Sequence, residues 1–202
     1  MLARILSGAL IGIDAYPVEV EVDIAQGLPQ FSTVGLPEGA VKESKDRVKS
    51  AIKNSGYEFP ARRITINLAP ADIRKDGAAF DLPMAVGILM ATGLLRGERP
   101  GRYLYMGELS LDGRVKPVRG ILPVSVGARA WDVDGLIVPL ENAPEGAIVE
   151  GLPVYGVHDL GEVVAFLTGE KVLEPCRVDA AELFRQAGTP ADDFGEVRGQ
   201  EH

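Results

Sequence analysis

The stretch "RKDGAAFDLP", from Arg74 to Pro83, decides which fold the chain is expected to adopt. It joins a charged Lys-Asp-Gly turn to a long apolar run, a layout by which many enzymes hold a reactive side chain at the start of a helix. The two residues after Gly77 are Ala78 and Ala79, which carry only methyl groups. The stretch is therefore an active site, a former active site or a simple loop, and the sequence around it has to distinguish these.

The apolar run that follows, Leu82 to Leu95, predicts a buried helix. Asp81 is expected to cap its first turn, where Pro83 is tolerated because the first helical residues need no internal hydrogen bond from their N–H groups. A membrane span needs about 18 to 20 apolar residues, so the run is too short to be one. Asp72, Asp76 and Asp81 are better explained as turn and cap residues than as a metal site.

A second helix is predicted upstream, from about Pro37 to Gly56, because apolar and basic residues follow a helical period there. One face of this helix consists of Val41, Ser44, Val48, Ala51, Ile52 and Ser55. Another face is basic and consists of Lys42, Lys45, Lys49 and Lys53. Pro37 suits the first turn and Gly56 suits the C-terminal cap.

Short strands account for much of the remaining chain. Three apolar or alternating bursts, "ARILSGALIGI", "YPVEVEVDIA" and "PQFSTVGL", predict three strands in a meander. A strand is predicted in "RRITINLAPADI", and two strands joined by an Asp112-Gly113 turn are predicted in "RYLYMGELSLDGRVKPV". Helices and strands then alternate to about Gly169. This order predicts an α/β fold with a mixed sheet and packed helices.

The composition is that of an ordinary globular protein, with 46% hydrophobic and 25% charged residues. The net charge is −8, from 29 acidic and 21 basic residues, so the chain as a whole is not a cation built to coat nucleic acid. Cys176 is the only cysteine, which excludes an internal disulfide and fits a cytoplasmic location. The apolar N-terminus lacks a small-residue cleavage site, so no signal peptide is expected.

The chain is expected to divide into a folded domain, residues 1–170, and an acidic linker, residues 171–202. The linker carries seven acidic and four basic side chains. Its apolar residues cluster only in "AAELFRQA", which predicts one short helix.

Two stretches resemble the proteolytic domain of Lon-type serine proteases, a fold related to the second domain of ribosomal protein S5. That family carries "KDGPSAG" at the start of an apolar helix and, later, "GEVTLRGRVLPIGGLKEK". Here these become "KDGAAFD", Lys75 to Asp81, and "GELSLDGRVKPVRGILPV", Gly107 to Val124. The resemblance covers about residues 1–170 and implies a Lon-protease-like, ribosomal S5 domain 2-like fold.

The resemblance also implies that the catalytic residues are missing. Lon chemistry needs a serine hydroxyl as nucleophile and a lysine amine to take its proton. Aligning the motifs puts Ala79 where the serine belongs and Leu122 where the lysine belongs. A methyl group cannot attack a carbonyl and an isobutyl group cannot accept a proton. An active serine peptidase is therefore the least favoured of the alternatives.

Neighbouring residues are not expected to replace the missing pair. Lys116 lies in a hairpin strand rather than in the helix, and Ser125 has no Lys or His beside it. His158 precedes Asp159 at a predicted strand-to-helix turn. No Cys and His spacing suggests zinc, so neither a metal nor a cofactor is expected in this chain.

The end of the chain, "DDFGEVRGQEH" from Asp192 to His202, resembles the entry to an AAA+ ATPase module. A nucleotide-binding G-x-x-x-x-G-K-[ST] loop requires a Gly-Lys pair, which this sequence lacks. With "GLPEGAVKESKDRVKSAI" and "FDLPMAVGIL", this ending makes the chain similar to the N-terminus of the magnesium-chelatase-like ComM/YifB family. The resemblance implies a non-catalytic binding or assembly domain.

The same resemblance implies a longer bacterial, cytoplasmic parent protein. That parent would be a hexameric AAA+ ATPase with a DNA branch-migration or helicase role in recombination or transformation. ATP and Mg would bind in the AAA+ module that is absent here. The expected partners of the domain are that module, neighbouring subunits and, as an alternative function, DNA, but no membrane.

The alternative function, DNA binding, rests on a locally basic segment. From Lys42 to Lys75 there are nine basic and four acidic residues, a net charge of +5 (9 − 4). Phosphate contacts require only positioned cations, but a solvated face partly paired with Glu43 and Asp46 is the simpler explanation. Apart from Tyr57 and Phe59, the segment has no aromatic residue on which a base could stack, which speaks against DNA binding. The candidate DNA contacts are Lys42, Lys45, Lys49, Lys53, Arg62, Arg63, Arg74 and Lys75.

Overall fold

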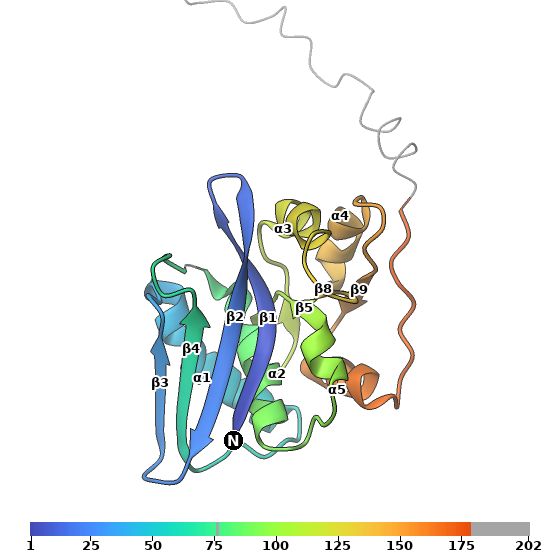
Figure 1. Cartoon of the computed structure of the whole chain (residues 1–202). Helices are drawn as coiled ribbons and strands as arrows, with labels where there is room; N and C mark the ends of the chain where they lie inside the picture. Colours follow the sequence, from blue (N-terminus) through green and yellow to red (C-terminus); the bar gives the residue numbers. More distant parts are fainter. Residues whose placement is uncertain (76, 179–202) are drawn as a thin grey trace, which may run out of the picture.

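The computed structural model describes residues 1–75 and 77–178, and its main element is a seven-stranded mixed sheet (Figure 1). The strands lie in the order β3-β4-β2-β1-β5-β8-β9. Their bounds are β1 Leu2–Ile11, β2 Asp14–Ala25, β3 Gln30–Val34, β4 Arg63–Ala69, β5 Tyr103–Tyr105, β8 Gly135–Pro139 and β9 Val154–Val157. Strand β2 is antiparallel to β1 and β4, whereas the other neighbours are parallel. The predicted α/β fold with a mixed sheet is confirmed.

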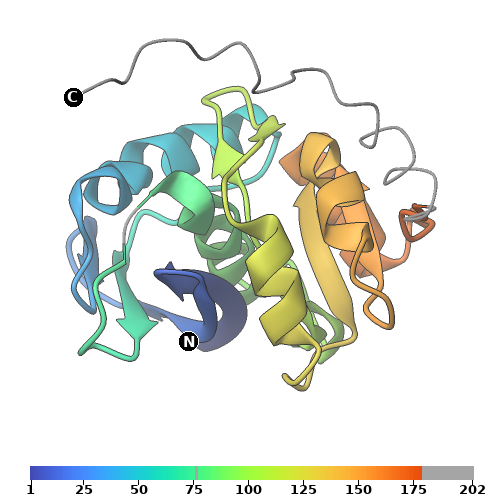
Figure 2. The same ribbon diagram turned by 90° about the horizontal axis from the view of Figure 1, so that it is seen from above.

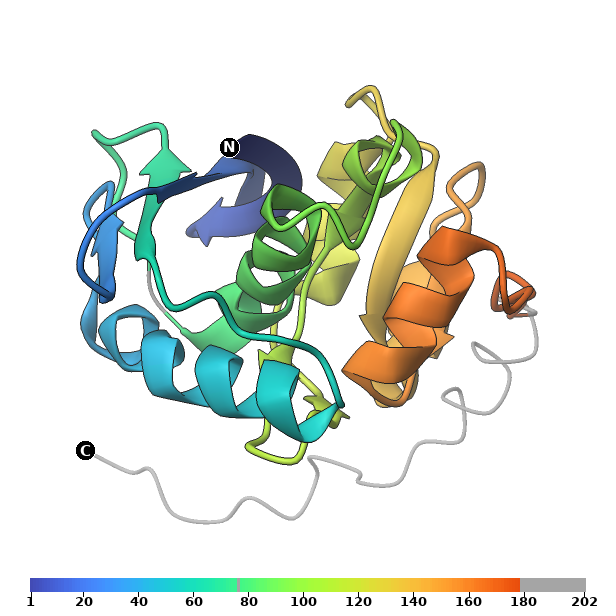
Figure 3. The ribbon, with the colours of Figure 1, turned by 90° about the horizontal axis from the view of Figure 1, so that it is seen from below.

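Helices cover the two faces of the sheet separately. They are α1 Gly39–Asn54, α2 Asp81–Ala91, α3 Ile121–Ala128, α4 Ala143–Ala147 and α5 Leu160–Thr168. Figure 3 shows α1, α2 and α5 on one face, where they share the larger apolar cluster. Helix α3 lies on the opposite side of the strands from α1 (Figure 2), and it shares a second apolar cluster with α4.

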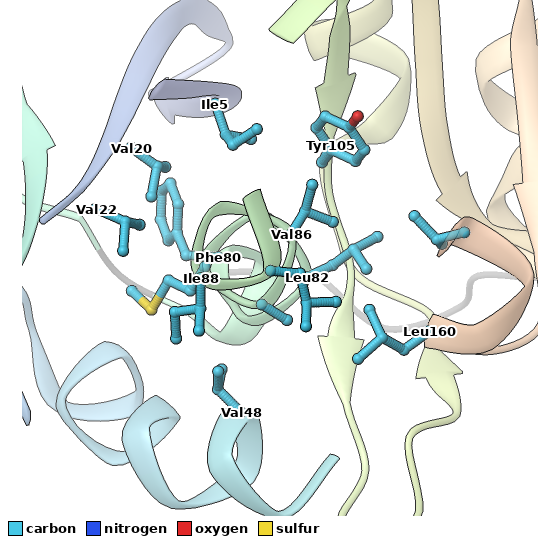
Figure 4. Packing of buried hydrophobic residues seen from close by; sticks show 14 of the residues in the cluster. Ile5, Val20, Val22, Val48, Phe80, Leu82, Val86, Ile88, Tyr105 and Leu160 are labelled. Atoms are coloured by element: carbon cyan, nitrogen blue, oxygen red, sulfur yellow. The ribbon is translucent and has the colours of Figure 1, made fainter. Parts of the chain in front are cut away.

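Helix α2 is the centre of the larger cluster, because ten of its eleven residues are buried. Figure 4 shows Val86 and Ile88 of this helix surrounded by side chains from β1, β2, β5 and α1. Gly87 lets strand β2 come close to the helix, since a Cβ atom there would lie 2.6 Å from Val22 Cγ2. The apolar run from Leu82 therefore forms a buried helix, as its sequence predicts, although it ends at Ala91 rather than near Leu95.

The predicted meander of three consecutive strands is wrong for its third strand. Strand β4, not β3, is the neighbour of β2, and the two pair over seven residues from Ala25↔Arg63 to Glu19↔Ala69. Strand β3 pairs in parallel with β4, and α1 crosses between them as in a βαβ unit. Strand β4 thus lies between β2 and β3 and pairs with both of them. The local sequence pattern of β4 predicts a strand but not which strands lie beside it.

The predicted Asp112-Gly113 turn is present, but the strands that it joins are short. They are β6 Glu108–Leu109 and β7 Val115–Lys116, which form a separate two-stranded sheet. Where the chain leaves the main sheet after β5, the N–H of Gly107 donates to the Ala79 carbonyl at 3.0 Å. The Gly107 carbonyl in turn accepts from the N–H of Leu82 at 3.0 Å, which ties the hairpin to the start of α2.

Residues 171–178 pack along the domain without forming a helix or strand. The N–H of Cys176 donates to the Val154 carbonyl at 2.7 Å, and Lys171 Nζ lies 2.6 Å from Glu162 Oε1. The predicted boundary at residue 170 stays a prediction, and the "AAELFRQA" and "DDFGEVRGQEH" stretches lie outside the described residues. Within residues 1–75 and 77–178, none of the helices has the length and apolar character that crossing a membrane requires.

Candidate nucleic-acid interface

Helix α1 presents exposed lysines on one side and packs into the core with the other, as its sequence predicts. The buried residues are Val41, Ser44, Val48, Ala51 and Ile52. The exposed lysines are Lys42, Lys45, Lys49 and Lys53. The helix ends just before Gly56, whose φ of 86° lets the chain turn back beneath the lysine face.

The last three of these lysines line a hollow of about 350 Å³ together with residues from two other segments. These segments are the start of β3 and the loop from Phe59 to Arg62. The charged groups that line the hollow are Lys45, Lys49, Lys53, Arg62 and Asp46. Four cations and one carboxylate give a local charge of +3 (4 − 1) on a chain whose net charge is −8.

Two phenylalanine rings provide an apolar wall to the hollow. Phe31 comes from β3 and Phe59 from the loop after α1, and their ring centroids are 6.3 Å apart with an angle of 10° between the planes. Both side chains are partly exposed. Tyr57 lies elsewhere, toward the start of α5, where a Cβ atom on Gly161 would come within 4.0 Å of its hydroxyl.

The lysines of this face are not neutralised by neighbouring carboxylates. Among the described residues, none of Lys42, Lys45, Lys49 and Lys53 has a carboxylate oxygen within 4.0 Å. Glu43, one of the two expected partners, lies 3.9 Å from Arg47 instead. The expected partial pairing of the lysine stripe with Glu43 and Asp46 is therefore wrong as far as salt bridges among residues 1–75 and 77–178 are concerned.

A buried polar network fixes the orientation of α1. Arg47 Nε donates to Asp81 Oδ2 at 2.6 Å and Arg47 Nη2 to Asp81 Oδ1 at 3.1 Å. The Ser44 hydroxyl and, at 3.2 Å, the N–H of Leu109 also donate to this carboxylate. Burial raises the pKa of the Asp81 carboxyl, and the hydrogen bond from Arg47 to Asp81 raises the pKa of Arg47. The expected capping role of Asp81 is wrong, because its side chain reaches α1 instead of its own helix.

The other predicted contacts do not line the hollow. Lys42 is exposed on the first turn of α1. Arg63 begins β4, where its Nε lies 3.9 Å from the position of a Cβ on Gly27. Arg74 is exposed but lies 3.4 Å from the carboxylate of Glu38. Of the eight predicted cations, four thus line the hollow and four do not.

Lys75 does not belong to this surface, because its side chain is fully buried. Its Nζ donates to the Pro70 carbonyl, and burial lowers the pKa of the amine. Its backbone bridges to Pro37 beside the start of α1, which pulls the residue into the domain. Among the described residues, no hydrogen bond joins this buried amine to a hydroxyl.

The two positions of the Lon-like motifs carry hydrocarbon side chains in the structure. Ala79 lies in a short 3-10 helix, Ala78–Phe80, and packs against the apolar cluster that contains Ile121. Leu122, in the first turn of α3, is 37% exposed, and its N–H donates to Glu145 Oε1 at 3.0 Å. The hydroxyl of Ser125 donates to the Ile121 carbonyl at 2.8 Å within the helix.

Phe31 is the residue of this site that the sequence interpretation missed. It lies 28 positions before Phe59, so no local pattern relates the two (59 − 31). The available signal was a strand, a helix and a second strand in succession, which as a βαβ unit places β3 beside β4. Because a meander was predicted instead, the pairing of β3 with β4 was not expected.

Comparison with known proteins gives a family for the chain. Residues 20–142 match the family described as "Subunit ChlI of Mg-chelatase". The competence protein ComM of Haemophilus influenzae is 38% identical over 206 residues, which cover 100% of this chain and 40% of that protein. The uncharacterised protein YifB of Escherichia coli is 41% identical over 201 residues, which cover 99% of this chain and 38% of that protein.

Lon proteases are also among the proteins to which the chain is similar. A Lon protease of Salinispora arenicola is 26% identical over 195 residues, which cover 89% of this chain and 24% of that protein. The chain therefore spans about two fifths of the ComM and YifB proteins and about a quarter of the Lon protease.

Proposed function

The chain belongs to the family of the ChlI subunit of Mg-chelatase, and from this premise we propose that it is a non-catalytic binding module of a longer ComM-like ATPase. The ligand of the module is a nucleic-acid backbone, which binds at the α1 face. The cluster of four cations in the hollow is the observation that carries this proposal. In the parent protein, ATP and Mg would act in an AAA+ module outside this chain, and the process served would be DNA branch migration or unwinding in the cytoplasm.

The absence of peptidase activity is part of the proposal. Acyl transfer by a Lon-type mechanism needs a hydroxyl at position 79 and an amine at position 122, and the residues there are Ala79 and Leu122. Lys75, the first residue of this loop motif, is a buried amine, but its Nζ donates a hydrogen bond to the Pro70 carbonyl. The purified chain is expected not to hydrolyse casein, and hydrolysis that is lost on changing residues 77–80 would contradict the proposal.

Binding would depend mainly on charge. Lys45, Lys49 and Lys53 lie at steps of four residues on one side of a helix, so they follow a line of about 12 Å along the helix axis. Such a line can contact phosphates without reading sequence, and binding releases counterions, so the affinity falls as salt is added. The network around Asp81 holds the helix that carries this line in a fixed orientation.

A mobility shift with labelled DNA at low salt tests the proposal. The double variant Lys45→Glu, Lys49→Glu is expected to abolish the shift. The matched control is Lys116→Glu, Arg119→Glu, which changes the charge equally at two exposed residues outside the hollow and should retain the shift. A wild-type chain that gives no shift even at low salt would show that the domain does not bind DNA by itself.

Assembly with other subunits is the second candidate function, and exposed apolar side chains favour it. Ile11 and Ile13 lie at the end of the β1–β2 hairpin and are 57% and 87% exposed. Val126, on the outer side of α3, is 58% exposed. Ile13→Glu with Val126→Glu in the full-length parent should reduce the sedimentation coefficient of the assembly, whereas unchanged sedimentation would exclude this surface from the subunit contact.

A further inference from the structure

We propose that the hollow beside α1 selects single-stranded nucleic acid and stacks an unpaired base on the Phe31–Phe59 pair. The inference rests on the proposed function, because it names the form of nucleic acid that the same cations would hold. Its support is the aromatic wall of the hollow, which the binding of a backbone alone does not require.

The cations and the two rings face the same space. Lys45, Lys49, Lys53 and Arg62 line the hollow together with Phe31 and Phe59. Cations alone attract a duplex as well as a single strand, because both carry phosphates. A ring face, in contrast, stacks only on a base that is not already stacked and paired inside a duplex. Proteins that bind single strands combine a basic groove with such aromatic platforms.

The size and position of the hollow fit one base and its backbone. Its volume of about 350 Å³ lies within the range of about 300–1,000 Å³ that is usual for pockets of small organic ligands. The lysine line runs along α1, on one side of the hollow, while Phe31 lies on β3. A strand that follows the lysines would therefore pass beside the ring faces. Gln30 is a further residue that lines the hollow, and it carries an amide of the kind that can bond to a base edge.

The two rings do not have the environment of ordinary core residues. Both pack partly against the main apolar cluster, but both remain partly exposed and form the wall of a basic hollow. The partial packing has a consequence for the test, since replacement by Leu keeps apolar contact with the core while it removes the flat ring face.

Fluorescence anisotropy with the 202-residue chain tests the inference, using labelled dT12, labelled U12 and a labelled 12-base-pair duplex at one salt concentration. The wild-type chain is expected to bind a single strand at least about 5-fold more tightly than the duplex. Phe31→Leu, Phe59→Leu is expected to weaken single-strand binding by about 5- to 100-fold and to leave duplex binding unchanged. A difference between dT12 and U12 decides whether DNA or RNA is the preferred strand.

The outcomes separate the two proposals. Equal binding of single strand and duplex, both lost in Lys45→Glu, Lys49→Glu and both kept in the Leu variant, would overturn this inference and leave the proposed function standing. No binding of any probe would overturn both. A second measurement does not depend on the Leu variant: in a Trp131→Phe background, the fluorescence of Phe59→Trp should be quenched by dT12 and not by the duplex. An unquenched signal at saturating dT12 would also overturn the inference.

Discussion

Arg47 and Asp81 form a two-pronged ion pair, with Nε to Oδ2 at 2.6 Å and Nη2 to Oδ1 at 3.1 Å, that joins the lysine-bearing helix α1 to the start of the buried helix α2. The carboxylate is fully buried, and the guanidinium side chain is 21% exposed. Asp81 belongs to the stretch from Arg74 to Pro83, which resembles a Lon-protease motif, so in this chain the stretch contains an anchor. That anchor positions the surface proposed to bind nucleic acid.

Removing the arginine should destabilise the domain strongly. Arg47→Met leaves the Asp81 carboxylate buried without its counter-charge, and breaking a buried pair in this way costs about 3–5 kcal/mol. The free energy of unfolding, measured in urea, should fall by about 3 kcal/mol because Arg47 is partly exposed. Arg102→Met, which removes an exposed pair with Asp134, is the control and should cost much less, because water screens an exposed pair. Equal losses in the two variants would contradict the anchoring role.

Gly87→Ala should disturb the packing of α2 on the sheet. The new Cβ would lie 2.6 Å from Val22 Cγ2, in the centre of the larger cluster, and overpacking of this kind costs about 1–3 kcal/mol. Gly39→Ala, at the start of α1, meets nothing within 4 Å and should be neutral or slightly stabilising. Thermal unfolding of the two variants measures the difference. An unchanged midpoint for Gly87→Ala would mean that α2 does not approach β2 so closely.

The ionised Glu162 carboxylate should stabilise the domain, and this stabilisation should be lost in acid. Burial opposes ionisation of its carboxyl, but Lys171 and the N–H of His158 outweigh this effect and hold its pKa below the usual value of 4.5. Because the folded pKa lies below the unfolded one, the stabilisation is present above pH 4.5 and is lost as the pH falls through the folded pKa. Glu162→Gln should therefore show a flatter dependence of unfolding temperature on pH between about 5 and 3. Glu150→Gln, at an exposed position, is the control and should follow the wild type.

Lys75→Met should show that the buried lysine has a different role from the exposed lysines of α1. It should leave the affinity for nucleic acid unchanged, because the Lys75 side chain is fully buried. Burial lowers the pKa of its amine, so the wild type gains stability as the pH rises from that lowered pKa toward the usual 10.5, and the variant should lose this gain. Anisotropy titrations and unfolding curves measured from pH 7 upward check the two parts. Weakened binding of nucleic acid by a variant with an intact fold would show that Lys75 does contribute to the interface.

The salt dependence of binding should report the number of cations in the contact. If Lys45, Lys49, Lys53 and Arg62 each meet one phosphate of a single strand, the slope of log K against log salt should be about −2.8, which is four times about −0.7. Lys49→Ala should reduce the magnitude of this slope by about 0.7, whereas Lys116→Ala should not change it. A slope near zero would show that charge does not drive the binding.

Much of the fold follows from local patterns. The two faces of α1, the burial of α2 and the turn at Gly113 were all predicted from spacing and residue type, because a helical period or a turn is fixed by residues close together in the chain. The meander was wrong because the partner of a strand is not a local property. The cap assigned to Asp81 was wrong because a distant arginine and serine bind the carboxylate better than its own helix does.

The sequence by itself determined that positions 79 and 122 hold no hydroxyl and no amine, and that one helix carries a line of lysines. Only the tertiary structure decided what surrounds that line. The insertion of β4 between β2 and β3 places Phe31 beside Phe59, and the bridge to Pro37 draws Lys75 into the interior. The physical reason is that side-chain identity and helical period depend only on residues close together in the chain. Strand order, burial and the contact between the two rings depend on segments that are far apart in the sequence.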